Sequence, residues 1–305
     1  RGKILEKIIN YRLTNYLIHL QLISPHHFAY LGGRSTTDCL ITILDQLHRN
    51  INQRIPSHAI FFDFSSAFDT VQHNILLWKL EHEYFICGRF LRTIKSFLSN
   101  RRSSVRLNGH YSDWQYDTVG VPQGGALSPL LYLIYKDNLA VLNSMPNLHL
   151  CLYADDLSLF TSKIPVPRQQ HLLQTGLLYI QWYSLHHGLR LNFTKTKQTY
   201  FKRTRIKDEY YPPLYFSKTV QNAFVSTRDD VTHMAANQRL KHDTKPFEYL
   251  GLTFDPTLRF QPHTEKTQKK CLKAYYTIHR HLRRLWSIPG DIAWRLFNTC
   301  VLSIM

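Results

Sequence analysis

Two adjacent carboxylates, Asp155 and Asp156, interrupt a mostly apolar stretch that is typical of two β-strands. Residues 150–153 and 157–160 flank the pair, so the pair is predicted to form the tip of a β-hairpin. Like charges side by side repel each other, and burial increases that cost. A divalent cation would relieve the repulsion, because Mg²⁺ prefers one or two carboxylates together with phosphate oxygens. An exposed Asp-Asp turn is the alternative, and the pair alone does not decide between the two.

Asp63 directly follows a second apolar segment, residues 59–62, with no turn signal before it. A carboxylate at a strand end often caps the helix that follows, but Asp69 and Thr70 are available for that role here. Three carboxylates on two strand ends would suit a site in which two metal ions clamp a phosphoryl transfer. We therefore predict that Asp63 lies near the hairpin pair.

A loop rich in Gly and Pro, residues 120–125, precedes an apolar stretch that continues to Leu139. Gly124 would let a ligand approach the main chain, and the Gln123 amide offers both a donor and an acceptor. Alone, this is an ordinary loop at the start of a helix. The order of the three segments along one chain makes the combined signal strong.

In this order, the segments resemble the reverse transcriptases of non-LTR (LINE-type) retrotransposons. The resemblance covers nearly the whole chain and includes further blocks that begin at Lys3, Phe28, Gly188 and Tyr249. It implies an α+β fold with a right-hand polymerase palm, in which helices back an antiparallel sheet. The implied subdomains are fingers truncated at their N-terminus (1–57), a palm (58–260) and the start of a thumb (261–305). The palm range includes a fingers hairpin near 100–118 and an irregular insertion near 202–246.

The resemblance implies that Asp63, Asp155 and Asp156 hold two Mg²⁺ ions, with Mn²⁺ as an alternative ion. Lys195 matches a lysine that could protonate the leaving pyrophosphate or stabilise its charge, and Lys197 is an alternative for the same role. These four residues, with Lys195 as the lysine, form the implied catalytic set.

Other matched positions imply contacts with the substrate. They are Arg34, Phe68, Gln123, Gly124, Tyr153 and Ala154. Phe68 matches an aromatic residue that crowds a ribose 2′-hydroxyl, although ordinary core packing is its alternative role. Arg34 is a candidate for a phosphate, because a guanidinium can fork onto phosphate oxygens. Leu31 departs from the family, which commonly has Arg at that position.

The implied function is an RNA-directed DNA polymerase that extends a DNA 3′-hydroxyl with dNTPs on an RNA template. Group II intron and retron enzymes share the catalytic signatures, but the run from Phe68 to His73 and the late Tyr249 block favour the LINE class. A decayed or repurposed domain that binds RNA or protein without catalysis is the alternative. Leu31 and the truncated fingers keep that alternative open.

The charge balance favours a polyanionic partner. The chain has 38 Lys and Arg against 21 Asp and Glu, a net charge of +17, which fits an RNA template and a DNA primer or target.

The five cysteines are scattered without zinc-ligand spacing, which favours a reducing compartment. No membrane span is expected, and the nucleus, where target DNA lies, is the expected location. The chain starts at Arg1 without Met, so we expect a fragment.

Periodicity predicts the main elements. A core-facing helix over 3–20 would bury Ile4, Leu5, Ile8 and Leu13, among others. The other predicted elements are helices over 36–51, 74–83, 88–99, 124–142 and 168–187, a strand over 58–63 and hairpins around Asn108-Gly109 and at 150–160. After Tyr249 the chain becomes helical and basic, which favours either a duplex-gripping thumb or a solvated helix face.

Overall fold

We describe a computed structural model of the chain, which covers residues 2–162, 164–203, 213–217, 239–240, 245–284 and 290–304. Most of the irregular insertion predicted at 202–246 therefore lies outside the described residues. The described chain forms two compact units, one containing residues up to Lys202 with 213–217 and 239–240, the other containing Arg203 with 245–284 and 290–304. The unit boundary falls before the predicted end of the palm at 260, so the Tyr249 block groups with the C-terminal helices.

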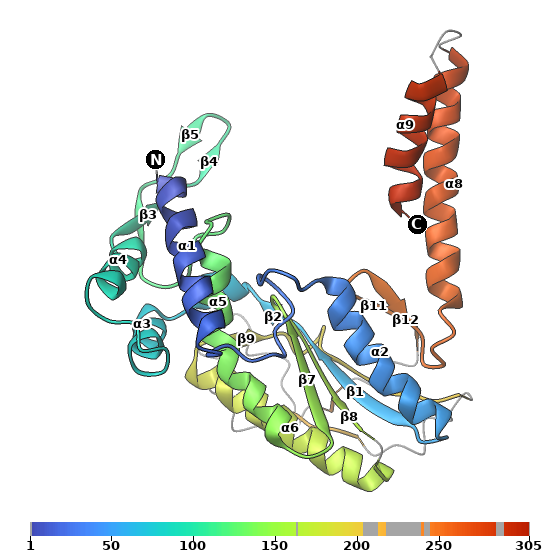
Figure 1. Cartoon of the computed structure of the whole chain (residues 1–305), viewed down its shortest axis with the longest axis horizontal. Coiled ribbons are helices and arrows are strands. Elements are labelled where there is room, and N and C mark those ends of the chain that lie inside the picture. Colours follow the sequence, from blue (N-terminus) through green and yellow to red (C-terminus); the bar gives the residue numbers. More distant parts are fainter. Residues whose placement is uncertain are drawn as a thin grey trace. The chain divides into compact units, whose positions relative to one another are not determined.

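A four-stranded antiparallel sheet forms the centre of the first unit (Figure 1). Its strands, in spatial order, are β10 (Lys197–Phe201), β1 (Ser57–Phe62), β8 (Asp156–Thr161) and β7 (Leu148–Tyr153). Every residue of β1 is buried, as expected for a central strand with both faces covered. The predicted strand at 58–63 and the hairpin at 150–160 are confirmed, and so is a mixed architecture of helices and sheet.

Two helices cover opposite faces of this sheet. The helix α6 (Val166–His186) brings Gly176 against Leu159 and Leu148, so closely that a Cβ at Gly176 would lie 2.6 Å from the Leu159 side chain. The helix α2 (Thr36–Asn52) brings Cys39 to Cys151, which points the other way along β7. The side chain of Ser35 caps α2 by accepting from the Asp38 N–H at 3.2 Å.

The helix predicted over 124–142 is shorter than expected. The α-helix α5 covers only Ser128–Lys136, and a 3₁₀ segment, Asp137–Ser144, follows it. Gly124 has a φ of +81°, which is incompatible with a helix, and Pro129 lies in the first turn, where its missing N–H costs nothing. All nine residues of α5 except Pro129 are buried.

The first helix forms as predicted, but most of the apolar side chains that were expected to be buried are exposed. The helix α1 (Gly2–His19) buries only Ile9, Leu13 and Leu17, a single stripe at four-residue spacing. Ile4, Leu5, Ile8 and Leu20 are between 47% and 65% exposed. Periodicity identified an apolar helix, but the described part of the unit packs against only one narrow stripe of it.

Shorter elements connect the sheet to α5. They are β2 (Phe64–Ser65), the 3₁₀ turn Ala67–Thr70, α3 (His73–His82), α4 (Gly88–Leu98), β3 (Arg101–Ser103), β4 (Arg106–Leu107), β5 (His110–Tyr111) and β6 (Gln115–Asp117). The predicted hairpin is confirmed: Leu107 pairs with His110, and Asn108 and Gly109 both have positive φ. The strand β9 (Arg190–Leu191) pairs with β2.

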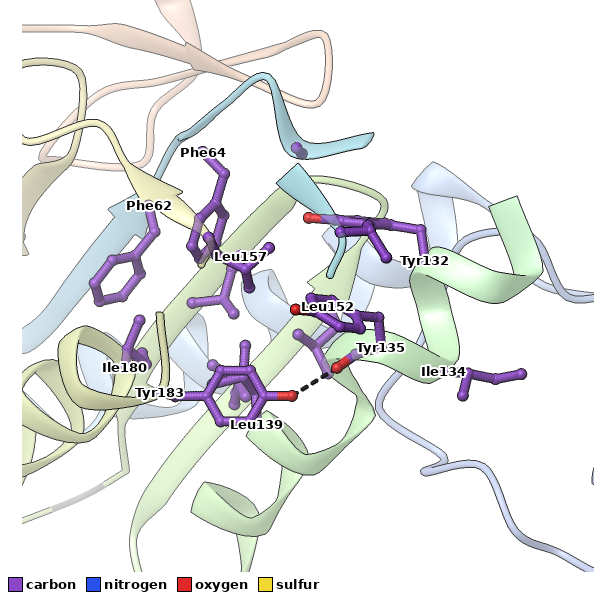
Figure 2. Packing of buried hydrophobic residues seen from close by; sticks show 14 of the residues in the cluster. Phe62, Phe64, Tyr132, Ile134, Tyr135, Leu139, Leu152, Leu157, Ile180 and Tyr183 are labelled. Carbon is purple, nitrogen blue, oxygen red and sulfur yellow. Dashed lines mark hydrogen bonds between the residues drawn. The ribbon is translucent and has the colours of Figure 1, made fainter. Parts of the chain in front are cut away.

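The buried core lies between the sheet, α5 and α6 (Figure 2). Phe62, Leu157 and Leu152 of the sheet region face Tyr135 of α5 and Tyr183 of α6. The Tyr183 hydroxyl donates to the Tyr135 carbonyl at 2.6 Å, which satisfies both groups in this apolar setting. The helices and the sheet therefore share one continuous core.

The second unit contains a small hairpin and two helices. Its elements are β11 (Phe247–Tyr249), β12 (Leu252–Phe254), α8 (Gln261–Arg284), α9 (Gly290–Cys300) and the 3₁₀ turn Leu302–Ile304. Asp255 accepts hydrogen bonds from the N–H groups of Thr257, Arg259 and Phe260, which orders the turn before α8. Among the helices in the described ranges, none is long and apolar enough to cross a membrane.

Two leucines of α1, one buried and one exposed, test this burial pattern. Leu13→Ala should lower the free energy of unfolding by about 2–5 kcal/mol, because it removes buried methyl groups and leaves a cavity. The matched control Leu5→Ala should change it by less than about 0.5 kcal/mol, because Leu5 is 55% exposed whereas Leu13 is 1% exposed. Urea titration measures both values, and equal losses would contradict the single buried stripe.

Candidate active site

The sheet brings the predicted carboxylates to one end. The antiparallel register of β1 and β8 pairs Phe62 with Leu157, and one further step brings Asp63 level with Asp156. In the neighbouring hairpin, Tyr153 pairs with Asp156, which leaves Ala154 and Asp155 as a two-residue turn. Ala154 has a φ of +50°, a left-handed conformation that costs an alanine about 1 kcal/mol. All three carboxylates therefore lie at the same end of adjacent strands.

The carboxyl groups influence one another. Partial burial and the neighbouring charges of Asp155 and Asp63 raise the pKa of Asp156 to about 6, although Lys136 acts in the opposite direction. Burial is the largest cause of this raised pKa and the neighbouring carboxylates add to it, because both disfavour the charged form of Asp156. This end of the sheet therefore favours the arrival of a cation.

The metal-binding prediction can be compared with the side-chain geometry. Within the described residues, no group of three or more His, Cys, Asp or Glu side chains is already arranged to hold a metal ion. Mg²⁺ does not need such a cage, since it uses one or two carboxylates together with phosphate oxygens and water. The carboxyl groups by themselves therefore do not form a complete metal site, and binding of a divalent cation by them stays a prediction.

Lys195 lies beside Asp63, and its role toward a pyrophosphate stays a prediction. Its Nζ is 3.9 Å from Asp63 Oδ2, and the two side chains are 70% and 37% exposed, so this ion pair is weak. The turn that carries Lys195 is fixed to the strand end, because Asn192 N–H donates to the Asp63 carbonyl at 2.8 Å. Lys197, the alternative, lies within β10 opposite Phe61.

The structure supports a packing role for Phe68, and its contact with a ribose stays a prediction. Its ring stacks on Tyr132 of α5 with centroids 4.8 Å apart, and the edge of Tyr30 approaches it at 6.5 Å. The ring is packed against the core, but it remains only half-buried. Phe68 is therefore held rigidly while part of its surface stays available to a ligand.

Tyr30 reaches the site because its segment joins the sheet edge. The N–H of Phe28 donates to the Leu152 carbonyl at 2.8 Å, and Leu152 N–H donates to the His26 carbonyl at 3.0 Å. Burial, Asp155 and Tyr153 raise the pKa of Tyr30 to about 12, so its hydroxyl stays protonated beside the turn. Sequence reasoning missed Tyr30, although its place in the block from Phe28 was a usable signal.

The Gly- and Pro-rich loop is fixed to the segment that carries Phe68. The N–H of Val121 donates to the Phe68 carbonyl at 2.8 Å, and Gln123 Nε2 donates to both Asp69 oxygens at 2.9 and 3.1 Å. Gly120 has a φ of +86°, and a Cβ there would lie 3.0 Å from the Asp69 backbone. Gly124 is exposed and has a φ of +81°, and a Cβ placed there would have no neighbouring atom within 4 Å.

Asp69 differs from its expected use. It lies inside the 3₁₀ turn Ala67–Thr70, and its carboxylate orients Gln123 instead of capping a helix. Sequence reasoning missed this contact because the two residues are far apart in the chain.

The side chain of Arg34 stabilises the loop before α2 through hydrogen bonds to its backbone. Its Nη1 donates to the Pro25 carbonyl at 3.0 Å and also to the His27 carbonyl. That nitrogen is therefore occupied by backbone oxygens, and contact of Arg34 with a phosphate stays a prediction.

Lys136 lies beneath the acidic turn and was also missed. Its ammonium donates to the Ala154 carbonyl. Burial lowers the pKa of Lys136 to about 8, and Asp155 and Asp156 limit that decrease. A lysine directly after the mostly apolar run 129–135 was the available signal.

Comparison with known proteins agrees with the class that this site suggests. The sequence matches the reverse transcriptase (RNA-dependent DNA polymerase) family over residues 1–254. The chain therefore belongs to the reverse transcriptase family.

Its relatives are proteins of mobile elements. The chain is 25% identical to the "Probable RNA-directed DNA polymerase from transposon BS" of Drosophila melanogaster, over 99% of this chain and 32% of that protein. It is 24% identical to the RNA-directed DNA polymerase from mobile element jockey of Drosophila funebris, over 88% of this chain and 27% of that protein. These matches confirm the predicted relationship to non-LTR retrotransposons. The chain spans about a third or less of the length of these relatives.

The chain is similar in structure to apo telomerase from Candida Tropicalis, truncated from its C-terminal domain. The match covers 68% of this chain and 42% of the telomerase chain. The identity is 13% and the TM-score is 0.49, too low to add to the assignment.

The raised pKa of Asp156 predicts a pH effect on stability. Because its pKa is about 6 in the folded chain against 3.8 ordinarily, protonated Asp156 favours folding, and this contribution is lost as the pH rises through that window. Asp156→Asn cannot titrate there, so the stability of this variant relative to the wild type should increase between those pH values and then level off. Urea titrations in metal-free buffer measure the difference, with exposed Asp113→Asn as the control. Parallel curves for Asp156→Asn and the wild type would contradict the raised pKa.

Proposed function

We propose that the chain is the polymerase region of a non-LTR reverse transcriptase, which extends a DNA 3′-hydroxyl with dNTPs on an RNA template. The observation that carries this proposal is the position of Asp63 level with Asp156, beside Asp155 in the turn. The raised pKa of Asp156 supports it, since a partly buried carboxylate beside other carboxylates is stabilised by a bound cation.

In this proposal Asp63, Asp155 and Asp156 would hold two Mg²⁺ ions, or Mn²⁺ in their place. Bound there, such ions would supply Lewis-acid chemistry for the attacking hydroxyl and the leaving pyrophosphate. Lys195 is close enough to Asp63 to present its ammonium to the same phosphates as a charge or proton donor. This lysine acts at the exposed side of the site, where a substrate has access.

The remaining predicted residues would orient the nucleotide. Gln123 directs its Nε2 to Asp69, which leaves its amide oxygen facing away from that carboxylate for a ligand. Phe68, held between Tyr132 and Tyr30, would crowd a ribose 2′-hydroxyl. Gly124 would allow close approach to the backbone, while Tyr153 and Ala154 would line the same end of the sheet. Contact of Arg34 with a phosphate is part of the same proposal.

We also propose the subdomains that the family implies. The four-stranded sheet with α5 and α6 would be the core of the palm (58–260), and residues 1–57 and the hairpin near 100–118 would belong to the fingers. Residues 261–305 would begin the thumb, where exposed or half-exposed Lys266, Lys269, Lys270 and Lys273 on α8 suit a phosphate backbone. A nuclear location follows from this proposal, because the target DNA lies there.

Removal of one carboxylate tests the polymerase activity. On poly-rA with an oligo-dT primer and Mg²⁺, Asp155→Ala should lower the rate of dTTP incorporation by at least about 10²–10³-fold, because it removes electrostatic support for the transition state. Asp45→Ala is the matched control, since Asp45 is an exposed carboxylate of α2 that pairs only weakly with Arg49.

Equal incorporation by Asp155→Ala and the wild type would contradict the catalytic site. It would favour the alternative of a repurposed domain that binds RNA or protein without catalysis.

Phe68 provides a test of sugar selection. Phe68→Ala should lower the preference for dNTPs over rNTPs by at least about tenfold, because it removes a rigid ring beside the predicted sugar position. Phe68→Tyr keeps the ring and should keep the preference. Single-nucleotide kcat/KM ratios for the two sugars measure the effect, and unchanged selectivity in Phe68→Ala would leave Phe68 with a packing role only.

A further inference from the structure

Lys136 is a buried charge that the proposed chemistry does not use. It is the last residue of α5 and is 1% exposed. Its Nζ lies 5.2 Å from the ring centroid of Tyr132 and 5.8 Å from that of Phe64. A buried ammonium is costly unless it is paired, so the partner that it does have is informative.

That partner is the backbone of the acidic turn. The Lys136 ammonium donates to the carbonyl of Ala154, the residue that adopts the left-handed φ of +50°. The Asp155 N–H belongs to the same planar peptide unit, so the hydrogen bond to the Ala154 carbonyl also fixes the orientation of the Asp155 backbone N–H. The tip of the β7–β8 hairpin is thereby attached to a helix that comes from elsewhere in the chain.

A second buried lysine in the same unit shows what is particular to Lys136. Lys79 is 2% exposed, and its ammonium donates to the Tyr135 carbonyl at 3.0 Å and the Tyr183 hydroxyl at 2.8 Å. The carboxylates that act on Lys79 are Glu83 and Asp137, whereas those that act on Lys136 are Asp155 and Asp156. Only Lys136 of these two lysines faces the acidic turn.

We propose that Lys136 is a positioning residue that holds the Ala154–Asp155 turn from below and supplies a fixed positive charge to the adjacent carboxylates. Its contribution is present before any metal ion binds, so the carboxylates keep one arrangement in the empty site. This inference rests on the proposed function in one respect, since the proposed function is what gives the turn a role in catalysis.

A double-mutant cycle in metal-free buffer tests the charge contact directly. In the wild type, Asp155→Asn relieves repulsion with Asp156 but also loses the attraction to Lys136. In the Lys136→Met background only the relief remains, so Asp155→Asn should raise the melting temperature by at least about 3 °C more than it does in the wild type.

Two backgrounds separate this effect from a merely structural one. In Lys79→Met, which removes an equally buried lysine, Asp155→Asn should cause the same shift as in the wild type. Lys136→Arg keeps the charge and should also give the shift of the wild type. Equal Asp155→Asn shifts in Lys136→Met and in the wild type would overturn the proposal.

The proposal can still be tested if Lys136→Met does not fold and has no measurable melting temperature. The comparison then uses soluble yield, which Asp155→Asn should restore in Lys136→Met but not in Lys79→Met, and failure to restore it overturns the proposal. The metal site of the proposed function is tested separately by the gain in melting temperature of the wild type on addition of Mn²⁺. A wild type without that gain counts against the metal site, whereas the metal-free cycle concerns Lys136 alone.

Discussion

The pairing register of β1 and β8 is the constraint on which the rest of the structure depends. Side chains alternate along a strand, so a slip by one residue would turn every side chain to the opposite face. Such a slip is strongly disfavoured here because both faces are covered, with Gly176 of α6 fitted against Leu159 on one face and Cys39 of α2 meeting Cys151 on the other. Asp63 and Asp156 are therefore brought level by the packing of the apolar core, in opposition to their mutual repulsion.

The acidic end of the sheet is supported by positive charge and hydrogen bonds of unequal strength. Lys195 approaches Asp63 from the exposed side at 3.9 Å, where water screens the pair. Lys136 lies on the buried side, where screening is weaker and its hydrogen bond to Ala154 is shielded from water. The exposed lysine is free to respond to a ligand, whereas the buried one acts on the turn at all times.

Much of this arrangement follows from local sequence signals, and the failures share a physical cause. The Asn108-Gly109 hairpin and the apolar strand before Asp63 depend on neighbouring residues, and both were predicted. The burial of α1 and the length of α5 depend on tertiary packing and on the left-handed Gly124, which periodicity does not report. Tyr30, Asp69 and Lys136 reach the site through contacts between distant segments, so only the three-dimensional structure reveals them.

Those distant contacts converge on α5. The loop that carries Gln123 leads into its first turn, Tyr132 in its middle stacks on Phe68, and Lys136 at its end holds Ala154. The loop is in turn bonded to the Phe68 segment through Val121, so the predicted nucleotide contacts and the acidic turn share one support. Because α5 is almost completely buried, it cannot shift for one of these groups without moving the others. The ring of Phe68 and the turn that carries Asp155 are therefore mechanically linked through this short helix, which gives the lysine at its end an influence beyond its single hydrogen bond.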